Sequence, residues 1–435
     1  MTDAKTLLAG LAERRPTIID LSLERMFAAL EALGNPHLKL PPVFHVAGTN
    51  GKGSTVAFLR ALHEAAGKKV HVYTSPHLVR FHERIVIAGV EISDEKLVDI
   101  ITRCDEAVNE RTLTYFEAVT CAAFLAFSET PADALLLEVG LGGRLDATNV
   151  VPVPATTIVT PVALDHQHYL GNDLATIAGE KAGIFRKDVP AVIGPQNPAA
   201  MAVLEEQAFS VGAQPFKYGE DWNVFEEQGR LIYQDEDGLS DLALPRLVGS
   251  HQIMNAGNAI AGMRSADQYP DDHTLSKGIA SAHWPARMQP LRYGPFIDRI
   301  EKATGETADI WLDGGHNPHA ARALAVTLAD LNERLERPVI LIAGLQNTKD
   351  LFGYFDALAG LVSQVHVVKA SLQSAASPKD VFAAAKKAGH NARISGDIAT
   401  AIHQIAEEFN ASGETPRILI GGSLYLAGEI LSDHG

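Results

Sequence analysis

Residues 43–55, "VFHVAGTNGKGST", decide the fold, because a short apolar run leads directly into a glycine-rich loop. "VFHV" (43–46) predicts a buried strand, and apolar residues at helical spacing predict a helix from about Ser54 to Gly67. Glycines between a strand and a helix let backbone N–H groups approach phosphate oxygens. The stretch therefore predicts a phosphate-binding loop in a nucleotide-using protein.

This loop differs from the usual P-loop pattern, because Gly53 separates Lys52 from Ser54. Lys52 is expected to bring positive charge to the phosphates, and a hydroxyl of Ser54 or Thr55 to bind Mg²⁺. The alternative is a glycine-rich turn with a surface lysine. The strand before the loop and the helix after it favour the phosphate site.

Further apolar runs alternate with helical segments after the loop. Strands are predicted at 69–73, 134–139, 156–164 and 189–194. Continuous apolar strands alternating with helices are typical of a mostly parallel, doubly wound sheet. Residues 216–247 alternate polar with apolar and predict small antiparallel hairpins, and a helix is expected from about Gln252 to Asp267.

A second α/β series follows the proline- and glycine-containing stretch at 284–295. Its predicted strands lie at 309–315, 338–344, 365–370, 393–396 and 417–423. We therefore expect two domains. Residues 1–294 are expected to form an α/β domain that holds the P-loop and a small antiparallel β region, and residues 295–435 a Rossmann-like α/β domain.

Composition limits the partners and the location of the protein. Its 435 residues carry a formal net charge of −16, which argues against nucleic acid or an anionic membrane as the main partner. Cys104 and Cys121 stand in apolar, helix-like surroundings and are expected to be buried structural thiols. No basic start with an apolar run and no membrane-length stretch is visible, so we expect a cytoplasmic protein.

Three polar residues follow three predicted strands: Ser75, Glu138 and His166. The carboxyl ends of parallel strands share one edge of a sheet, which is also the edge of the phosphate loop. Mg²⁺ takes one or two protein oxygens together with phosphates and water. Taken singly, Glu138 could form a strand-end salt bridge and His166 could be a capped turn residue. Together the three predict a magnesium site.

Two other strings carry polar residues of lower specificity. In "GEKAGIF" (179–185), residue chemistry alone favours a Glu180–Lys181 pair on a helix surface, because a charged lysine is costly to bury. In "LDGGHNPHA" (312–320), Asp313 and His316 stand at a predicted strand end and form a polar site.

The strings together resemble one family. "HVAGTNGKGST", "TSPHL", "LTYFE", "EVGLGGRLDATN", "LDHQHYLG", "EKAGIF", "ARMQ" and "DGGHNPHA" occur in the order of the folylpolyglutamate synthase/dihydrofolate synthase family, a branch of the Mur-type ligases. The resemblance runs from about residue 17 to the C-terminus, and the glycine between lysine and serine is characteristic of this branch. It implies a Mur-ligase-type ATPase domain followed by a C-terminal glutamate-ligase domain.

The resemblance also implies residue roles. The ATP contacts are Thr49, Asn50, Gly51, Lys52, Gly53, Ser54, Asn255, Arg287 and Asp313, with His316 near the adenine. Two Mg²⁺ ions are implied, with Ser75, Glu138 and His166 as ligands. Lys181 is implied to be carbamylated by CO₂, so that its new carboxylate supports the second metal. Pterin binding is implied for Thr114, Tyr115, Phe116, Glu117, Leu145, Asp146 and Ala147. Lys52, Lys181 and His316 are the implied catalytic residues.

For the pterin segments, residue chemistry leaves an alternative. Phe116 begins an apolar helical stripe that more often packs a core, and Asp146 could simply order its loop. On the first hypothesis the aromatic wall holds a flat heterocycle, and Asp146 accepts its amino and ring N–H groups.

The implied reaction is the ATP-dependent formation of an amide. ATP phosphorylates a carboxylate, and the α-amine of L-glutamate displaces phosphate from the acyl phosphate. The expected substrates are ATP, L-glutamate, dihydropteroate and reduced folates, and we expect a monomer. Restriction to polyglutamate synthesis stays open as an alternative.

Two other classes fit the sequence less well. Only 42 residues precede Val43, whereas a peptidoglycan Mur ligase carries a nucleotide-sugar domain there. A GTPase would read guanine with Asn-Lys-x-Asp, and "QNTKD" (346–350) lacks that spacing.

Overall fold

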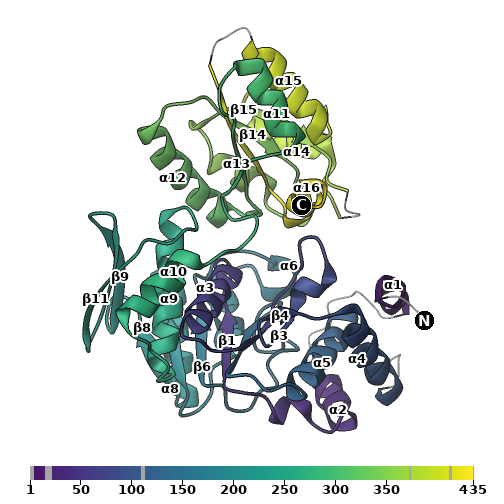
Figure 1. The fold of residues 1–435 in the computed structure, drawn as a ribbon, viewed down its shortest axis with the longest axis vertical. Helices are drawn as coiled ribbons and strands as arrows, with labels where there is room; N and C mark the ends of the chain where they lie inside the picture. Colours follow the sequence, from purple (N-terminus) through teal and green to yellow (C-terminus); the bar gives the residue numbers. More distant parts are fainter. Residues whose placement is uncertain (1–3, 15–21, 109–112, 372–373, 411–413, 435) are drawn as a thin grey trace. The chain divides into compact units, whose positions relative to one another are not determined.

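The computed structural model describes residues 4–14, 22–108, 113–371, 374–410 and 414–434 (Figure 1). The chain divides into two compact units, Met1–Arg246 with Ile253–His283 and Leu247–Gln252 with Trp284–Gly435. Both units are α/β, as predicted. The division falls before the predicted domain boundary at residues 294 and 295, because β12 (Gln289–Leu291) pairs with a strand of the second unit.

The N-terminal unit is built on one large sheet with the strand order β4-β3-β2-β5-β1-β6-β7-β8. These strands are β1 (Val43–Ala47), β2 (Val70–Tyr73), β3 (Ile85–Ile87), β4 (Val90–Glu91), β5 (Ala134–Glu138), β6 (Thr156–Val159), β7 (Pro190–Ile193) and β8 (Gln214–Lys217). β2, β5, β1, β6, β7 and β8 run parallel, whereas β3 and β4 form an antiparallel edge. Every residue of β1 and β5 is buried, which explains why their sequences are apolar apart from His45 and Glu138.

Helices cover both faces of this sheet. They are α1 (Ala4–Arg14), α2 (Glu24–Ala32), α3 (Lys52–Ala65), α4 (Asp94–Ala107), α5 (Tyr115–Ser128), α6 (Gln167–Leu170), α7 (Leu174–Ala182), α8 (Pro198–Val211), α9 (Ser250–Ser265) and α10 (Asp272–Ser281), with 3-10 turns at η1 (Pro36–Leu38) and η2 (Phe81–Arg84). Leu135 and Leu137 of β5 pack into the cluster formed with α5, and α3 packs on β1, β2 and β5.

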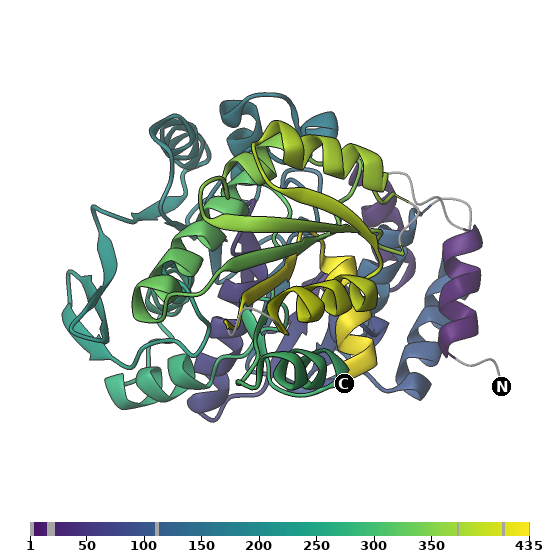
Figure 2. The ribbon, with the colours of Figure 1, turned by 90° about the horizontal axis from the view of Figure 1, so that it is seen from above.

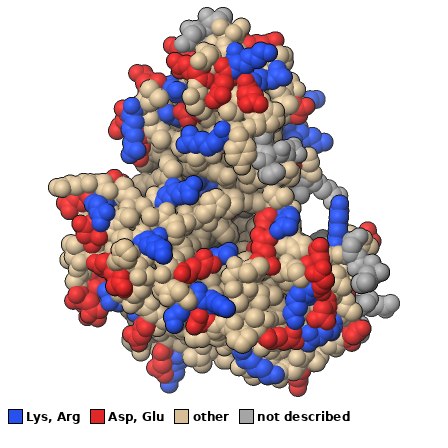
Figure 3. Space-filling view, in the orientation of Figure 1, with Lys and Arg blue, Asp and Glu red and all other residues tan. Residues whose placement is uncertain are grey.

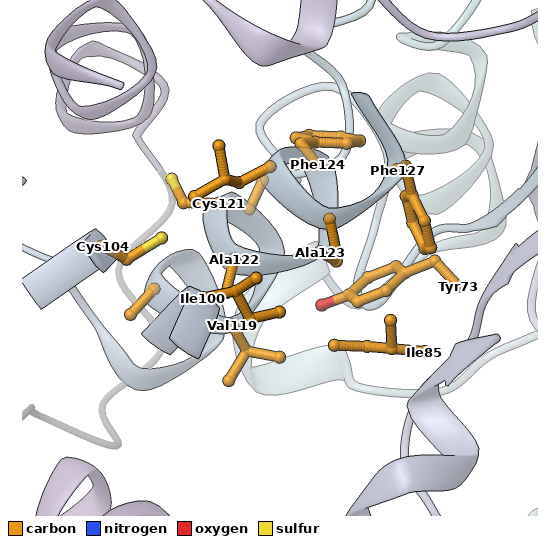
Figure 4. Close-up of a cluster of buried hydrophobic side chains, with 14 of the residues drawn as sticks. Tyr73, Ile85, Ile100, Cys104, Val119, Cys121, Ala122, Ala123, Phe124 and Phe127 are labelled. Atoms are coloured by element: carbon orange, nitrogen blue, oxygen red, sulfur yellow. The ribbon is translucent and has the colours of Figure 1, made fainter. Parts of the chain in front are cut away.

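The core around α5 contains both cysteines. Val119, Ala122 and Phe127 lie close to Tyr73 and Ile85 (Figure 4). Cys104 and Cys121 are buried in the same cluster, as predicted for structural thiols.

The predicted hairpins form a separate antiparallel sheet with the order β11-β10-β9. Its strands are β9 (Trp222–Glu227), β10 (Arg230–Asp235) and β11 (Gly238–Leu242). Trp222 stacks on Tyr233 with ring centroids 6.0 Å apart, so an aromatic cross-strand pair anchors the sheet.

The C-terminal unit has a second sheet with the order β12-β13-β17-β14-β15-β16. Apart from β12, its strands run parallel: β13 (Asp309–Leu312), β14 (Val339–Ala343), β15 (Val362–Val368), β16 (Ala392–Gly396) and β17 (Arg417–Gly421). Its helices are α11 (Pro295–Thr304), α12 (Pro318–Arg334), α13 (Leu351–Asp356), α14 (Pro378–Lys387), α15 (Ile398–Asn410) and α16 (Leu424–His434). In Figure 2 the green and yellow strands of this unit lie between helices of the same colours.

Side chains of both charges appear on the face drawn in Figure 3, where acidic and basic residues are interspersed. Among the described residues, no helix combines the length and apolar character needed to span a bilayer.

Candidate active site

The glycine loop after β1 is shaped by close contacts that leave no room for a side chain. Gly48 has a φ of 146°, and a Cβ there would come within 3.0 Å of Thr160 Oγ1. Gly51 has a φ of 92° at the start of α3, and a Cβ there would clash with Asn255 Oδ1. Both positions therefore need glycine, and Asn255 is packed directly on the loop.

The chain after β6 wraps over the same loop. β6 ends at Val159, and the carbonyl of Pro161 then accepts hydrogen bonds from the N–H groups of Thr49 (3.0 Å) and Asn50 (3.4 Å). The predicted strand over 156–164 is therefore too long. Its second half is bonded to the phosphate loop and not to a neighbouring strand.

Two lysines converge on this loop. Lys52 Nζ and Lys181 Nζ donate to the same Gly48 carbonyl oxygen, at 3.1 and 2.9 Å. Lys181 lies in α7 and is only 4% exposed. Burial, followed by the charge of Lys52, lowers the pKa of the Lys181 ammonium to about 7.

The predicted surface pair of Glu180 with Lys181 is wrong. Glu180 turns outward to Arg144, with 2.7 Å between Glu180 Oε1 and Arg144 Nη2, whereas Lys181 points into the protein. Adjacent residues on a helix point in different directions, so their proximity in sequence did not make them partners.

Glu138 and Ser75 meet at the carboxyl edge of the sheet. Glu138 ends β5 and is buried, and its Oε2 accepts the backbone N–H of Ser75 at 3.1 Å. A carboxylate beside a hydroxyl residue suits Mg²⁺, which prefers oxygen ligands and few protein groups.

His166 lies at the start of α6 in an exposed, left-handed conformation with a φ of 51°. Its backbone N–H donates to Asp165 Oδ1 at 2.8 Å. Within the described parts of the chain, no group of three or more His, Cys, Asp and Glu side chains could hold a metal. The metal role of His166 therefore stays a prediction.

The first predicted pterin segment, Thr114 to Glu117, begins α5. Thr114 Oγ1 accepts the Glu117 N–H, and Glu117 Oε2 accepts the Thr114 N–H, so the two form a capping box. Glu117 also forms a 2.9 Å ion pair with Arg25. Phe116 is half-buried, and its ring lies so close to Gly140 that a Cβ there would clash with it. The aromatic segment therefore meets the loop after β5.

The second predicted pterin segment, Leu145 to Ala147, lies in that loop. Asp146 is buried and accepts hydrogen bonds from the N–H groups of Leu141 (2.8 Å) and Thr148 (3.0 Å), and from the Thr148 hydroxyl (2.5 Å). Burial raises the pKa of this carboxyl, while the hydrogen bonds oppose the rise. These bonds order the loop, and a pterin contact of Asp146 stays a prediction.

The C-terminal unit gathers the remaining predicted residues at the end of β13. Asp313 is buried, and its two oxygens accept the N–H groups of Met288 (2.8 Å) and Gly315 (2.6 Å). Arg287 Nη1 donates to the Ala286 carbonyl at 2.9 Å, and His316 Nδ1 lies 3.0 Å from the Gly314 carbonyl. Arg287, Asp313 and His316 thus belong to one cluster of this unit.

Comparisons with known proteins match both parts of the chain. The family model of the Mur ligase middle domain matches residues 46–263, and that of the dihydrofolate synthetase C-terminal domain matches residues 297–433. The dihydrofolate synthase/folylpolyglutamate synthase of Escherichia coli (strain K12) is 37% identical over 358 residues, covering 82% of this chain and 79% of the relative. The chain belongs to the dihydrofolate synthase/folylpolyglutamate synthase family.

Two further comparisons support the same family. The folylpolyglutamate synthase of Lacticaseibacillus casei is 33% identical over 423 residues, covering 93% of this chain and 92% of the relative. The bifunctional enzyme of Yersinia pestis, solved with AMPPNP and an Mn ion, superposes with a TM-score of 0.86 at 30% identity, covering 99% of this chain and 98% of that one. As a member of this family, the protein is an ATP-dependent ligase of the Mur type.

The structure of this ligase also brings in residues that the sequence did not single out. Thr160 donates to the Asn50 carbonyl at 2.8 Å, and His45 is buried in β1 beside the loop. In the C-terminal unit, His251 is influenced by the charges of Asp313 and Arg287, and burial lowers its pKa. The only signal in the sequence was a polar residue inside or next to an apolar run.

Proposed function

We propose that this ligase adds L-glutamate to dihydropteroate, giving dihydrofolate, and also to reduced folates, giving polyglutamates. The contact of Phe116 with Gly140 carries the proposal. It joins the first predicted pterin segment to the loop that holds the second, and Gly140 is two residues after Glu138. An aromatic wall next to a phosphate-transfer site suits a pteridine whose carboxylate must be activated. The alternative is synthesis of polyglutamates alone, as the name of the Lacticaseibacillus casei relative states.

The proposed chemistry has two steps. An oxygen of the acceptor carboxylate attacks the γ-phosphorus of ATP, and ADP leaves. The α-amine of L-glutamate then attacks the acyl carbon, phosphate leaves, the amine loses a proton and an amide remains. Lys52 and the N–H groups from Gly51 to Ser54 hold the phosphates and offset their charge. Thr49 and Asn50 belong to the same loop, and their N–H groups bond the Pro161 carbonyl. No nucleophilic side chain is needed.

Ser75 and Glu138 fit a Mg²⁺ ion, and we include His166 as the third protein ligand. When bound, Mg²⁺ supplies positive charge against the phosphate oxygens. Glu138 is buried, so its carboxylate stays close to the loop and is not free to reorient in solvent. The Yersinia pestis relative was solved with an Mn ion and AMPPNP, which supports a divalent metal and ATP here.

Lys181 is proposed to carry a carbamate. The neutral amine attacks CO₂, a C–N bond forms, and one proton is released to solvent. A pKa of about 7 leaves a substantial neutral fraction at physiological pH. The product is an anion beside Lys52, so a repulsive pair of cations becomes an attractive pair. Its carboxylate would help to hold a second Mg²⁺.

The remaining proposed contacts are to ATP. Asn255 is supported by its packing on Gly51 of the loop. Arg287 and Asp313 are supported by their common cluster at the end of β13, and His316 is proposed to lie near the adenine.

The deciding experiment measures ADP release and product mass with L-glutamate, using dihydropteroate or tetrahydrofolate as acceptor. We expect both acceptors to gain glutamate. Lys52→Met is the control, because it should remove turnover with both. Extension of tetrahydrofolate with dihydropteroate left unchanged would contradict the bifunctional proposal and leave the polyglutamate synthase.

A further inference from the structure

His45 is a buried histidine that the proposed reaction does not use. It lies in β1, three residues before Gly48, and its ring Nε2 is 2.9 Å from the hydroxyl of Thr148. The same hydroxyl is 2.5 Å from Asp146 Oδ1. Both Asp146 oxygens already accept backbone N–H groups, from Leu141 and Thr148, so the Thr148 hydroxyl donates to Asp146 and accepts the Nε2–H of His45. One direction of donation and one ring tautomer therefore satisfy all three groups.

This chain of bonds ends in the loop 140–149. Asp146 receives the N–H groups of Leu141 and Thr148, so the carboxylate closes the loop on itself. Without the Thr148 hydroxyl, Asp146 loses a donor in addition to the two N–H groups, and His45 loses its acceptor. Buried polar groups that lose a partner are costly, so the loop is expected to rearrange.

The opposite side of the loop is attached to the segment that carries Lys181. The Arg144 N–H donates to the Glu180 carbonyl at 2.7 Å, and Asn149 Nδ2 donates to the Gly183 carbonyl at 3.0 Å. Arg186 Nη2 also donates to Asn149 Oδ1 at 2.6 Å. The loop thus spans from the phosphate-loop strand to α7, with the Phe116 contact at its first residue, Gly140.

We propose that His45 is a positioning residue that, through Thr148 and Asp146, holds loop 140–149 in the shape that binds the acceptor. The inference rests on the proposed role of this loop in acceptor binding. His45 itself touches no substrate in this scheme. Burial, followed by the charge of Arg186, lowers the pKa of His45 to about 3, so its ring is neutral in the working range of the enzyme.

The test compares Thr148→Val, which removes the hydroxyl at nearly constant shape, with Thr148→Ser, which keeps it. His45→Leu and His45→Gln form the second pair, because only glutamine offers an N–H to the hydroxyl. We expect Thr148→Val and His45→Leu to raise the acceptor KM about tenfold or more and to speed amide exchange across residues 140–149. The ATP KM should change less than about twofold, and Thr148→Ser and His45→Gln should stay near the parent.

Thr156→Val is the matched control. Thr156 is buried in β6, and its hydroxyl bonds Ser265 Oγ at 2.9 Å, away from the loop. It should lower the Tm without changing the acceptor KM. If Thr148→Val behaves in the same way, with unchanged exchange in the loop, the proposal is overturned. If exchange in the loop rises while the parent enzyme turns over neither acceptor, the ordering of the loop by His45 is supported and the proposed function fails instead.

Discussion

Replacing Lys181 with methionine should stabilise the unmodified protein while removing its activity. The ammonium is buried, and its pKa falls from 10.5 to about 7 on folding. Each tenfold change in an equilibrium constant is worth about 1.4 kcal/mol, so the protonated lysine costs about 5 kcal/mol of unfolding free energy. Methionine fills similar space without the charge and gives up the hydrogen bond to Gly48, worth about 1 kcal/mol. A net gain of a few kcal/mol is expected at pH 6.5.

The effect has a defined dependence on pH. Below pH 7, Lys181 is protonated in both folded and unfolded chains, so the full cost applies. Between pH 7 and 10.5 the unfolded chain binds a proton that the folded chain does not, and the stability of the parent rises with pH. The advantage of Lys181→Met should therefore shrink steadily from pH 7 to pH 9.5.

The assay is urea unfolding in CO₂-free buffer, followed by the fluorescence of Trp222. Trp284 and Trp311 are replaced by phenylalanine, so that the one remaining tryptophan reports on the N-terminal unit, where it is buried. In a second measurement, ¹³C-bicarbonate should give a carbamate resonance in the parent and none in Lys181→Met. A variant that is less stable than the parent at pH 6.5, or a difference that does not change with pH, would refute the reasoning.

Other substitutions test the rest of the site. Glu138→Gln keeps an oxygen that accepts the Ser75 N–H but loses the negative charge. We expect kcat to fall at least about 100-fold with little change in Tm. Near-normal turnover at saturating Mg²⁺ would show that Glu138 is not a metal ligand. Gly48→Ala should abolish ATP binding measured by calorimetry. Adding Thr160→Ala should restore only part of it. The clashing hydroxyl is removed, but the Cβ and the carbonyl oxygen of residue 160 stay 3.0 Å from the new Cβ, and the backbone strain at a φ of 146° remains. Full recovery would show that these remaining contacts and the strain are unimportant. Asp313→Asn leaves one of the N–H groups of Met288 and Gly315 without its acceptor. We expect the C-terminal unit to lose about 1–3 kcal/mol of unfolding free energy in thermal unfolding. An unchanged Tm would contradict this.

The sequence predicted most of the parallel strands of both sheets, because buried parallel strands leave an apolar trace, but it did not predict β3, β4, β8 or β12. β1, β5 and β14 are buried along their whole length and coincide with predicted runs. The strand predicted at 156–164 was too long. Pro161 and Ala163 are apolar residues, but their backbone groups bond to the phosphate loop. Composition does not reveal which partner a backbone carbonyl finds.

The site was predicted in part, and mainly through resemblance. Local sequence predicted Lys181 to lie on a surface, because the Gly48 carbonyl that accepts its hydrogen bond lies 133 residues earlier in the chain. His45 was overlooked for the same reason, since its partner Thr148 is 103 residues away. Local patterns show which face of an element is apolar, whereas pairs of buried polar groups depend on how distant segments meet.

The carbonyl of Gly48 accepts hydrogen bonds from both Lys52 and Lys181. It thereby places the proposed site of CO₂ addition next to the lysine that is proposed to bind ATP. If CO₂ converts Lys181 to a carbamate, residue 181 places a negative charge beside Lys52. The affinity of the loop for nucleotide phosphates then changes as well. Linkage is reciprocal, so ATP must then alter the affinity of Lys181 for CO₂ by the same factor. The CO₂ concentration at which half of the enzyme is carbamylated would therefore differ between ATP-free and ATP-saturated protein by that same factor.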